Sequence, residues 1–307
     1  MTGGRAVFIV GCGDLGRRVA RLARQDGRPV GALVRDETSA QALRTRGIAA
    51  LVGDLDRRDS LPPLALGGAT VFYFVPPQGG GYSDARVKNF LAALAPGEIP
   101  ARLVYLSTSG VYGDTGGVPA TESMAPRPLT ARARRRLDAE DTLRAWGTAR
   151  NVPVVILRVT NIYGPGRLPL HHLQTGHPLL AEEDSRPTSR IHVEDLARIC
   201  LAAEKRGRAG AVYNVRDEEP CSATAYFAAV AAAAGLACPP RIPLSEAREV
   251  MKPLLLSYFT EERLLCNDRM RRELQVELLY PTLAAGLAAS LSSVSAGPDD
   301  GPADKNP

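Results

Sequence analysis

The feature that most constrains the fold is a glycine pattern near the N-terminus, where an apolar run leads directly into three closely spaced glycines. Residues 6–10 are apolar, and Gly11, Gly13 and Gly16 follow them. Apolar residues then recur at the three- and four-residue spacing of a helix, and a second apolar run covers Val30–Val34. The pattern predicts a strand, a tight turn, a helix and a second strand, which together form the βαβ unit of a parallel sheet.

The three glycines have separate physical roles in such a unit. The first permits a sharp turn out of the strand, the second lets the backbone approach a diphosphate, and the third lets helix and strand pack closely. Unpaired N–H groups at the start of the helix then point at the phosphates. We therefore predict a dinucleotide site, contacted by the loop residues Gly11, Gly13, Asp14, Leu15 and Gly16. The alternative is a glycine-rich turn without a ligand.

The residue after the second strand indicates which cofactor the site takes. NAD sites carry Asp or Glu there to hold a ribose hydroxyl, whereas NADP sites leave out the carboxylate and supply an Arg for the 2′-phosphate. Here Val34 is followed by Arg35, which favours NADP over NAD. Asp36 is the next residue, so NAD is the less favoured alternative, in which Arg35 is an ordinary solvated charge at a strand end.

Strand and helix patterns continue to alternate as far as residue 165, the sequence signature of a doubly wound parallel sheet in an α/β fold. Asp54 and Leu55 follow the third apolar run, and Val75 and Pro76 end the fourth. We add these four residues to the predicted cofactor site. Asp54 is well placed to meet an adenine amino group, although Asp is also a common turn residue.

The alternation lapses after residue 165, which divides the chain into two interleaved parts. We predict a Rossmann-type NADP-binding domain of residues 1–165 plus about 190–218. A smaller C-terminal lobe of about 166–189 plus 219–291 is expected to bind the substrate. The polar stretch 292–307 contains Gly and Pro and is expected to be a disordered tail. Helices of the smaller lobe are predicted over residues 223–236 and 261–275.

The composition excludes several classes of function. The chain has 307 residues and a net charge of +5, with arginines spread along it rather than gathered in a tail, so we expect no nucleic-acid partner. Five cysteines without CxxC spacing argue against a disulfide framework and a zinc site, and they suit a reducing cytoplasm. No apolar stretch suits a membrane span or a targeting segment. We therefore expect a cytoplasmic protein without a metal, whose partner is a small molecule.

Several longer motifs follow the glycine loop in order. They are GDL at Gly53, LSTSGVYG at Leu106, LRVTNIYGPG at Leu157, RIHVEDLA at Arg190, VYNV at Val212, NDRMRREL at Asn267 and LYPTLAAGL at Leu279. Over about residues 5–290, the chain resembles the extended short-chain dehydrogenase/reductase superfamily, in its NAD-dependent epimerase/dehydratase branch. The resemblance implies a Rossmann core whose C-terminal lobe closes over a substrate. It also implies hydride transfer between nicotinamide and a carbon that bears oxygen, and a possible homodimer through the helix at 129–147.

The resemblance implies a catalytic set as well, and this chain departs from it. The family uses a Ser or Thr after the fifth strand to orient the substrate oxygen. Thr108 matches that position, and a capping hydroxyl is the alternative. The family's proton-passing Tyr and the Lys four residues later are replaced by Arg132 and Arg136, in a register set by Glu140. The chain therefore resembles atypical members that lack the Tyr–Lys pair.

Arginine cannot do the work of the tyrosine, because its guanidinium stays protonated and only donates hydrogen bonds. Arg136 could replace the lysine as a donor to ribose, and Arg132 could hold an anionic substrate or a developing oxyanion. The alternative is a solvated basic helix face.

A proton relay would then need another group. Tyr82, on a glycine-rich loop, is the preferred candidate, whereas Tyr112, Tyr163 and His192 have stronger structural interpretations. Asn161 either touches the substrate, as its family counterpart does, or only fixes its loop.

Two functions are open at this point. One is an NADP-dependent oxidoreductase or epimerase that acts on a small carbonyl or sugar-like substrate through a non-standard proton relay. The other is a non-catalytic NADP(H)-binding regulatory or redox-sensing protein. The sequence does not name the substrate.

Overall fold

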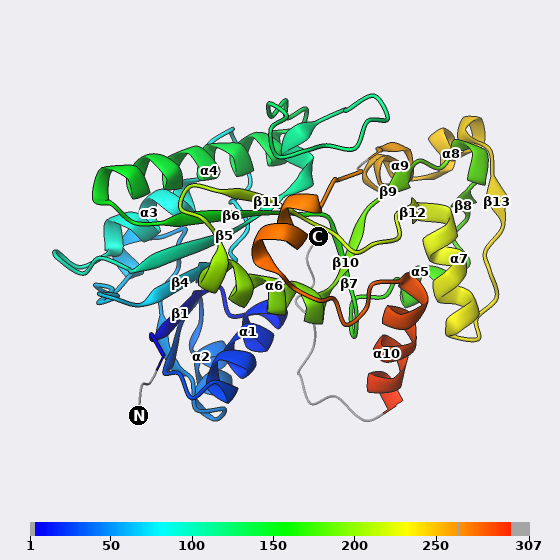
Figure 1. Ribbon diagram of the computed structural model, residues 1–307. Helices are drawn as coiled ribbons and strands as arrows, with labels where there is room; N and C mark the ends of the chain where they lie inside the picture. The colour runs from blue at the N-terminus through cyan, green and yellow to red at the C-terminus, as the bar shows by residue number, and fades with distance from the viewer. Residues whose placement is uncertain (1–3, 263, 296–307) are drawn as a thin grey trace.

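A seven-stranded parallel sheet with helices on both faces forms the larger part of the molecule (Figure 1). The computed structural model describes residues 4–262 and 264–295. The strand order is β11-β6-β5-β4-β1-β2-β3, so the direction of the connections reverses between β1 and β4. Ligands of such sheets bind beyond the carboxyl ends of the strands at this switch point. The strands are β1 (Val7–Val10), β2 (Val30–Val34), β3 (Ala49–Val52), β4 (Thr70–Tyr73), β5 (Arg102–Thr108), β6 (Val154–Val159) and β11 (Val212–Val215).

Both faces of the sheet are covered, which explains why its strands are continuous apolar runs. Alternate residues of β1 enter opposite cores: Val7 and Ile9 join one apolar cluster, and Phe8 and Val10 join the other. The predicted α/β, doubly wound fold is confirmed. The first cluster lies under α1 (Asp14–Gln25), α2 (Glu37–Arg44) and α6 (Val193–Arg206), and the second under α3 (Ala85–Ala93) and α4 (Ala131–Arg150).

A smaller lobe lies beside the carboxyl edge of the sheet (Figure 1). It has its own apolar cluster, built around the aromatic residues Tyr163, Tyr226, Phe227 and Phe259. Its helices are α5 (Leu170–Gln174), α7 (Ala223–Ala233), α8 (Leu244–Val250), α9 (Pro253–Thr260) and α10 (Leu283–Ser295). Three two-stranded sheets pair β7 (Asn161–Tyr163) with β10 (Arg190–His192), β8 (Leu179–Leu180) with β13 (Arg241–Ile242), and β9 (Pro187–Thr188) with β12 (Cys221–Ser222).

The predicted helix over residues 261–275 is wrong in its first half. The helix begins at Asp268 and ends in a π-helical turn at Met270–Leu274, and residue 263 lies outside the described residues. Before that turn, Cys266 N donates to Ala120 O at 2.9 Å, and Arg216 Nε donates to Leu265 O at 2.6 Å. These long-range hydrogen bonds hold the segment extended, so tertiary contacts override its weak helical preference.

The predicted disordered tail is also wrong at its start. Residues 292–295 form the last turn of α10, while 296–307 lie outside the described residues. The helix packs closely on the smaller lobe through Gly286, where a Cβ would lie 2.2 Å from Tyr163 Oη. None of the helices in the described part of the chain is long and apolar enough to cross a membrane.

Candidate active site

The glycine loop between β1 and α1 has the backbone shape of a ligand cradle. Gly11 adopts φ +84°, and a Cβ there would lie 2.6 Å from Val75 Cγ2 at the end of β4. At Gly16, a Cβ would lie 3.0 Å from Gly11 O and 3.2 Å from Ile9 Cγ2. Glycine is therefore required at the first position for the turn and at the third for helix–strand packing, as the sequence pattern predicts.

The N-terminus of α1 is left open to a ligand. Its N-cap is Gly13, and within residues 4–262 and 264–295 no side chain caps it. The other helices that flank the sheet begin with a capping side chain, supplied by Asp36, Asp84, Thr130 and His192. The first-turn N–H groups of α1 thus lie uncapped at the switch point, where a phosphate group would satisfy them.

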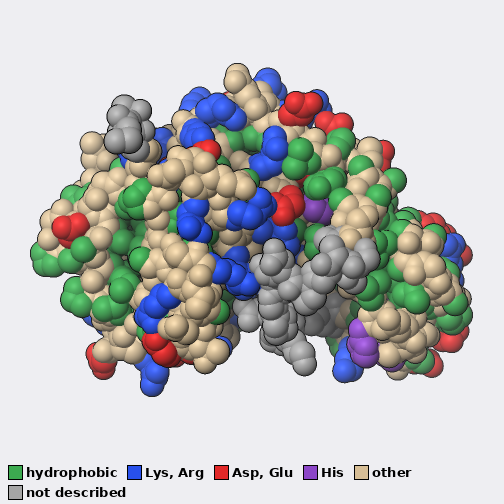
Figure 2. Space-filling model, turned by 90° about the horizontal axis from the view of Figure 1, so that it is seen from below, with side chains coloured by type: hydrophobic (Ala, Val, Ile, Leu, Met, Phe, Trp, Pro, Cys, Tyr) green, Lys and Arg blue, Asp and Glu red, His purple; other side chains and the backbone are tan. Residues whose placement is uncertain are grey.

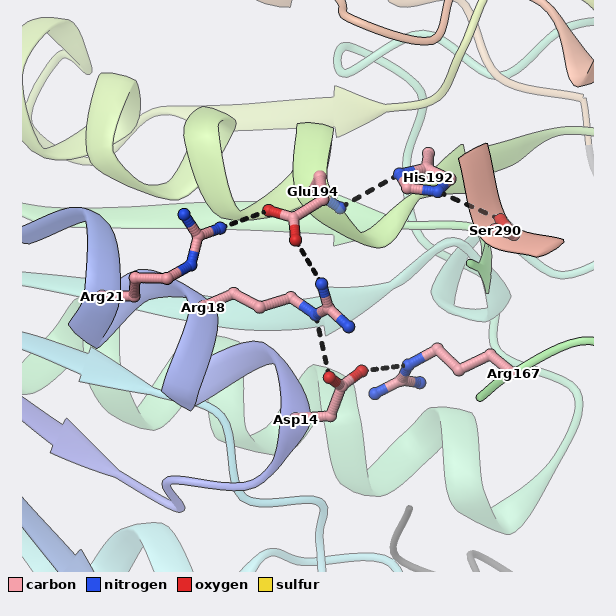
Figure 3. Close-up of polar contacts among 7 residues, drawn as sticks. All are labelled: Asp14, Arg18, Arg21, Arg167, His192, Glu194 and Ser290. Carbon is pink, nitrogen blue, oxygen red and sulfur yellow. Dashed lines mark hydrogen bonds and ion pairs between the residues drawn. The ribbon is translucent and has the colours of Figure 1, made fainter. Parts of the chain in front are cut away.

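A polar network joins α1 to the smaller lobe (Figure 3). Asp14 accepts from Arg18 Nε at 2.8 Å and from Arg167 Nε at 2.6 Å. Burial alone would raise the pKa of Asp14, but the charges and hydrogen bonds of Arg167 and Arg18 outweigh burial and lower it. Glu194, at the start of α6, binds Arg18 and also Arg21, whose Nη2 lies 2.9 Å from it. The predicted cofactor residue Asp14 therefore offers a ligand its backbone N–H, because its carboxylate is already paired.

His192 caps α6 within the same network. Its Nδ1 accepts from Glu194 N at 3.3 Å, so the proton lies on Nε2, which lies 3.3 Å from Ser290 Oγ of α10 (Figure 3). Burial, with repulsion from Arg18, lowers the pKa of His192 to about 4. The ring is therefore neutral at physiological pH and holds the two lobes together, in agreement with its structural interpretation.

The end of β2 presents a guanidinium and no available carboxylate. Arg35 is exposed. The Asp36 carboxylate caps α2: Oδ1 accepts from Ser39 N at 2.8 Å and Oδ2 from Ser39 Oγ at 3.0 Å. These hydrogen bonds, together with the charge of Arg35, lower the pKa of Asp36.

The loops after β3 and β4 carry the other predicted cofactor residues. Asp54 is partly buried and accepts from Asp56 N at 2.9 Å, and Leu55 is buried. Arg86 binds Asp56 Oδ2 at 2.6 Å and Pro76 O at 2.8 Å. Arg86 thus joins the loop of Asp54 and Leu55 to the loop of Pro76.

The first turns of α4 lie against the carboxyl end of β5. Thr108 Oγ1 accepts from Gly110 N at 3.2 Å, which is the capping role that the sequence leaves as the alternative. Arg136 is 7% exposed, and its Nη1 donates to Leu106 O at 2.9 Å and to Tyr105 Oη at 3.2 Å. The solvated-face interpretation therefore fails for Arg136, which packs against β5 at Tyr105 and Leu106.

Arg132 lies one turn nearer the start of α4 and is exposed. In the described part of the chain it has no ion-pair or hydrogen-bond partner. Partial desolvation, with repulsion by Arg136 and Arg135, lowers the pKa of Arg132. Because Arg132 and Arg136 share a helix face, Arg132 lies beyond the end of β5 on the side of Thr108. Arg132, Arg135 and Arg136 therefore concentrate positive charge in the first turns of α4.

The remaining predicted residues are held by neighbouring side chains. Tyr82 is 61% exposed, and the Arg134 guanidinium carbon lies 4.9 Å from its ring centroid. Arg135 Nη1 donates to Gly81 O at 2.9 Å, so this loop rests on α4. Asn161 Nδ2 donates to Thr188 Oγ1 at 2.7 Å and therefore fixes its loop. Among the described residues, neither Tyr82 nor Asn161 makes a hydrogen bond to Thr108.

Sequence reasoning missed Arg167 as part of this site. It directly follows the motif LRVTNIYGPG, but nothing local indicates that it reaches a residue 153 positions earlier. A surface hollow of about 440 Å³ lies elsewhere, between α1, α6 and residues 275–277, and it is lined by ordinary surface side chains. We place the site at the sheet edge instead, because the cradle and the uncapped helix N-terminus are there.

Comparison with known proteins agrees with this geometry. Residues 7–215 match the family described as the NAD dependent epimerase/dehydratase family. A trifunctional UDP-glucose 4,6-dehydratase/UDP-4-keto-6-deoxy-D-glucose 3,5-epimerase/UDP-4-keto-L-rhamnose-reductase of Arabidopsis thaliana is 30% identical over 128 residues. That match covers 37% of this chain and only 19% of the plant protein.

Two further similarities extend over most of the chain. A 4-hydroxy-2-methyl-3-oxo-4-farnesyl-3,4-dihydroquinoline-1-oxide ketoreductase of Stigmatella aurantiaca is 26% identical, covering 73% of this chain and 71% of the ketoreductase. The solved structure of a conserved protein of unknown function from Silicibacter pomeroyi DSS superposes with a TM-score of 0.78 at 30% identity. It covers 94% of this chain and 99% of that protein. The chain thus belongs to the NAD dependent epimerase/dehydratase family.

Proposed function

We propose that this protein is an NADP(H)-dependent oxidoreductase or epimerase that acts on a small carbonyl or sugar-like substrate. The observation that carries the proposal is the crowded glycine cradle before an uncapped α1, which suits a dinucleotide diphosphate and little else. Relatives named as dehydratase, epimerase, reductase and ketoreductase support redox chemistry at an oxygen-bearing carbon. When bound, the nicotinamide supplies or accepts the hydride.

The end of β2 supports NADP over NAD. The carboxylate of Asp36 is occupied as a helix cap, so it is not available to a ribose hydroxyl. The exposed Arg35 stands where a 2′-phosphate would need a cation.

We expect the Arg35→Asp substitution to remove the cofactor preference. A charged hydrogen bond contributes about 1.5–3 kcal/mol, so affinity for NADP and NADPH should fall roughly 10- to 100-fold, while affinity for NAD should hold or rise. Calorimetric titration with all four nucleotides measures the change. Arg150→Asp, at the far end of α4, controls for the loss of a surface charge. An NADP-to-NAD affinity ratio that is unchanged by Arg35→Asp would contradict the assignment.

On the substrate side, Thr108 and Asn161 match family positions, whereas Arg132 and Arg136 stand where the family has Tyr and Lys. Thr108 is proposed to orient the substrate oxygen, and Arg132 to bind an anionic group or a developing oxyanion next to it. Arg136 Nη1 donates to protein acceptors, so we propose that Nε or Nη2 of Arg136 donates to the ribose. Tyr82 is proposed as the proton donor, because its loop rests on the same helix as Arg132. Asn161 is proposed to contact substrate through the face that Thr188 leaves free.

Hydride transfer is the direct test of the enzyme. Purified protein is incubated with NADPH labelled at the nicotinamide C4 and a panel of 2-oxo acids, neutral ketones and nucleotide sugars. We expect label to appear in at least one anionic substrate, and kcat/KM for it to fall about 10- to 100-fold in Arg132→Gln. Arg150→Gln, which removes an exposed charge at the far end of the same helix, is the matched control and should change little. Absence of label transfer across the panel would contradict the proposal.

One observation favours a second candidate, a non-catalytic NADP(H)-binding regulatory protein. The position of the family's proton donor holds an arginine, which cannot release a proton. Such a sensor must bind NADP and NADPH with different affinities, because a ligand that binds two conformations equally shifts neither. Equal affinities in the same calorimetric series would exclude it.

A further inference from the structure

We propose that Arg167 is a cofactor-binding residue that the structure aims at the diphosphate of the dinucleotide, with Asp14 as the residue that positions it. The inference rests on the proposed function only in requiring a bound dinucleotide. It assigns a role to an arginine that lies outside the glycine loop, on the segment that connects β7 to the smaller lobe.

The position of Asp14 makes a positive partner necessary. Asp14 is the first residue of α1, so its carboxylate lies at the helix end that would receive a diphosphate. An unpaired carboxylate there would repel the phosphates. The carboxylate is neutralised by two arginines, Arg18 on its own helix and Arg167 on the segment that follows β7 (Figure 3).

The two arginines are not equivalent. Arg18 binds two carboxylates, Asp14 through Nε and Glu194 through Nη1. Arg167 binds Asp14 through Nε alone, and its terminal nitrogens have no partner among residues 4–262 and 264–295. The Arg167 side chain is 31% exposed, against 11% for Arg18. Arg167 therefore keeps a planar pair of N–H donors available at the mouth of the site, and such a pair suits two phosphate oxygens.

Asp14 holds the guanidinium in that orientation. A charged hydrogen bond of 2.6 Å from Nε to Asp14 Oδ2 anchors the guanidinium beside the start of α1, and no hydrogen bond joins its terminal nitrogens to the residues drawn (Figure 3). The electrostatic setting favours an anion, because three arginines, Arg18, Arg21 and Arg167, surround only two carboxylates, Asp14 and Glu194. Seen from below, basic side chains gather along the middle of the molecule, over the region of α1 and α6 (Figure 2).

The alternative is that Arg167 only ties the smaller lobe to α1. The two roles separate when ligands with and without a diphosphate are compared. Binding of NADPH, of 2′-phosphoadenosine 5′-diphosphoribose and of adenosine 2′-monophosphate is measured by calorimetry for wild type, Arg167→Met and Arg167→Lys. Methionine keeps most of the side-chain length without the charge, and lysine keeps the charge without the paired donors. Arg21→Met, in the same network but facing Glu194, is the matched control.

We expect Arg167→Met to weaken binding of both diphosphate ligands roughly 10- to 100-fold and to leave adenosine 2′-monophosphate unchanged. Arg167→Lys should recover part of the loss, and Arg21→Met should bind all three ligands like wild type. Unchanged diphosphate binding in Arg167→Met would overturn the inference while leaving the proposed function standing. An equal loss for all three ligands would also overturn it, because it would show a structural role. A wild type that binds none of the nucleotides would overturn the proposed function together with this inference.

A double-mutant cycle tests the positioning role of Asp14. If Asp14 orients Arg167, Asp14→Asn should weaken NADPH binding severalfold in the wild-type background and have no effect in Arg167→Met. If Asp14 acts only as a repulsive charge, Asp14→Asn will strengthen binding equally in both backgrounds, and the positioning role is excluded.

Discussion

Replacing Arg158 by Met is expected to destabilise the protein by about 3–5 kcal/mol, the cost of removing one partner from a buried ion pair. Arg158 is 2% exposed, and its Nη2 lies 2.7 Å from Oε2 of the fully buried Glu140. Burial alone would lower the pKa of Arg158, but the hydrogen bonds and charge of Glu140 outweigh it and raise the pKa. Without Arg158, the Glu140 carboxylate keeps Ser107 Oγ, at 2.5 Å, as its remaining buried donor.

The measurement is urea unfolding followed by tryptophan fluorescence. Trp146 is the only tryptophan in the chain and lies on α4, two turns after Glu140, so it reports on the helix concerned. Arg144→Met is the control, because Arg144 is a third exposed and lies 3.4 Å from Glu140. We expect that control to cost less than about 1 kcal/mol.

A second variant identifies the cause of the loss. Adding Glu140→Gln to Arg158→Met replaces an unpaired buried carboxylate with a neutral amide, so the double variant should be more stable than Arg158→Met alone. If the loss of unfolding free energy in the double variant equals the sum of the losses in the two single variants, Arg158 and Glu140 do not act as a unit. A loss in Arg158→Met as small as that in Arg144→Met would show that the pair contributes little.

The second large effect is expected at Asp217, which follows β11 and is 1% exposed. Among the described residues, no side chain donates a hydrogen bond to its carboxylate. Burial raises the pKa of Asp217 to about 7, although Arg190 and Arg216 act to lower it. The neighbouring Tyr163 Oη and Arg190 Nε are also buried without hydrogen-bond partners in the described part of the chain. Asp217, Tyr163 and Arg190 therefore form a buried polar cluster in which several polar atoms lack hydrogen-bond partners among the described residues.

The sign of the pH dependence follows from the raised pKa. The folded protein holds the Asp217 proton up to about pH 7, whereas an unfolded aspartate releases it near 3.9. The stabilisation that the Asp217 proton gives the folded state is therefore complete below about pH 4. It is lost progressively as the pH rises from about 4 through 7, by a total on the order of 4 kcal/mol. Asp217→Asn removes the titration and keeps the shape.

We expect Asp217→Asn to be more stable than wild type at pH 8.5, with an advantage that shrinks as the pH falls. Between pH 5 and 8.5, the wild type should lose about 2–3 kcal/mol more than the variant. Urea midpoints at pH 5, 7 and 8.5 provide the comparison, with the exposed Asp59→Asn as the control. Parallel stability profiles for wild type and Asp217→Asn would show that Asp217 is ionised in the folded protein at all three pH values.

The agreement between sequence and structure is best where the signal is local. The apolar run of β1 and the three glycines of the turn depend on residues a few positions apart, so local pattern and backbone sterics are enough to predict them. The helix over 261–275 was predicted from the same kind of local pattern and is wrong in its first half, because Ala120 and Arg216 hold residues 265–266 extended. Residues 292–295 are helical because α10 packs through Gly286 on Tyr163, a contact that polar composition does not reveal.

By itself, the sequence determined the doubly wound sheet, the position of the glycine loop and the arginine that follows β2. Local propensity and periodicity specify these features, and they act within one element. Only the tertiary structure decided how the charges pair. It buried Arg136 against β5, joined Glu140 to Arg158, used Asp36 as a helix cap and brought Arg167 to Asp14. Charge pairing depends on distances and burial that arise only when remote segments pack together, so a linear pattern of charged residues cannot predict it.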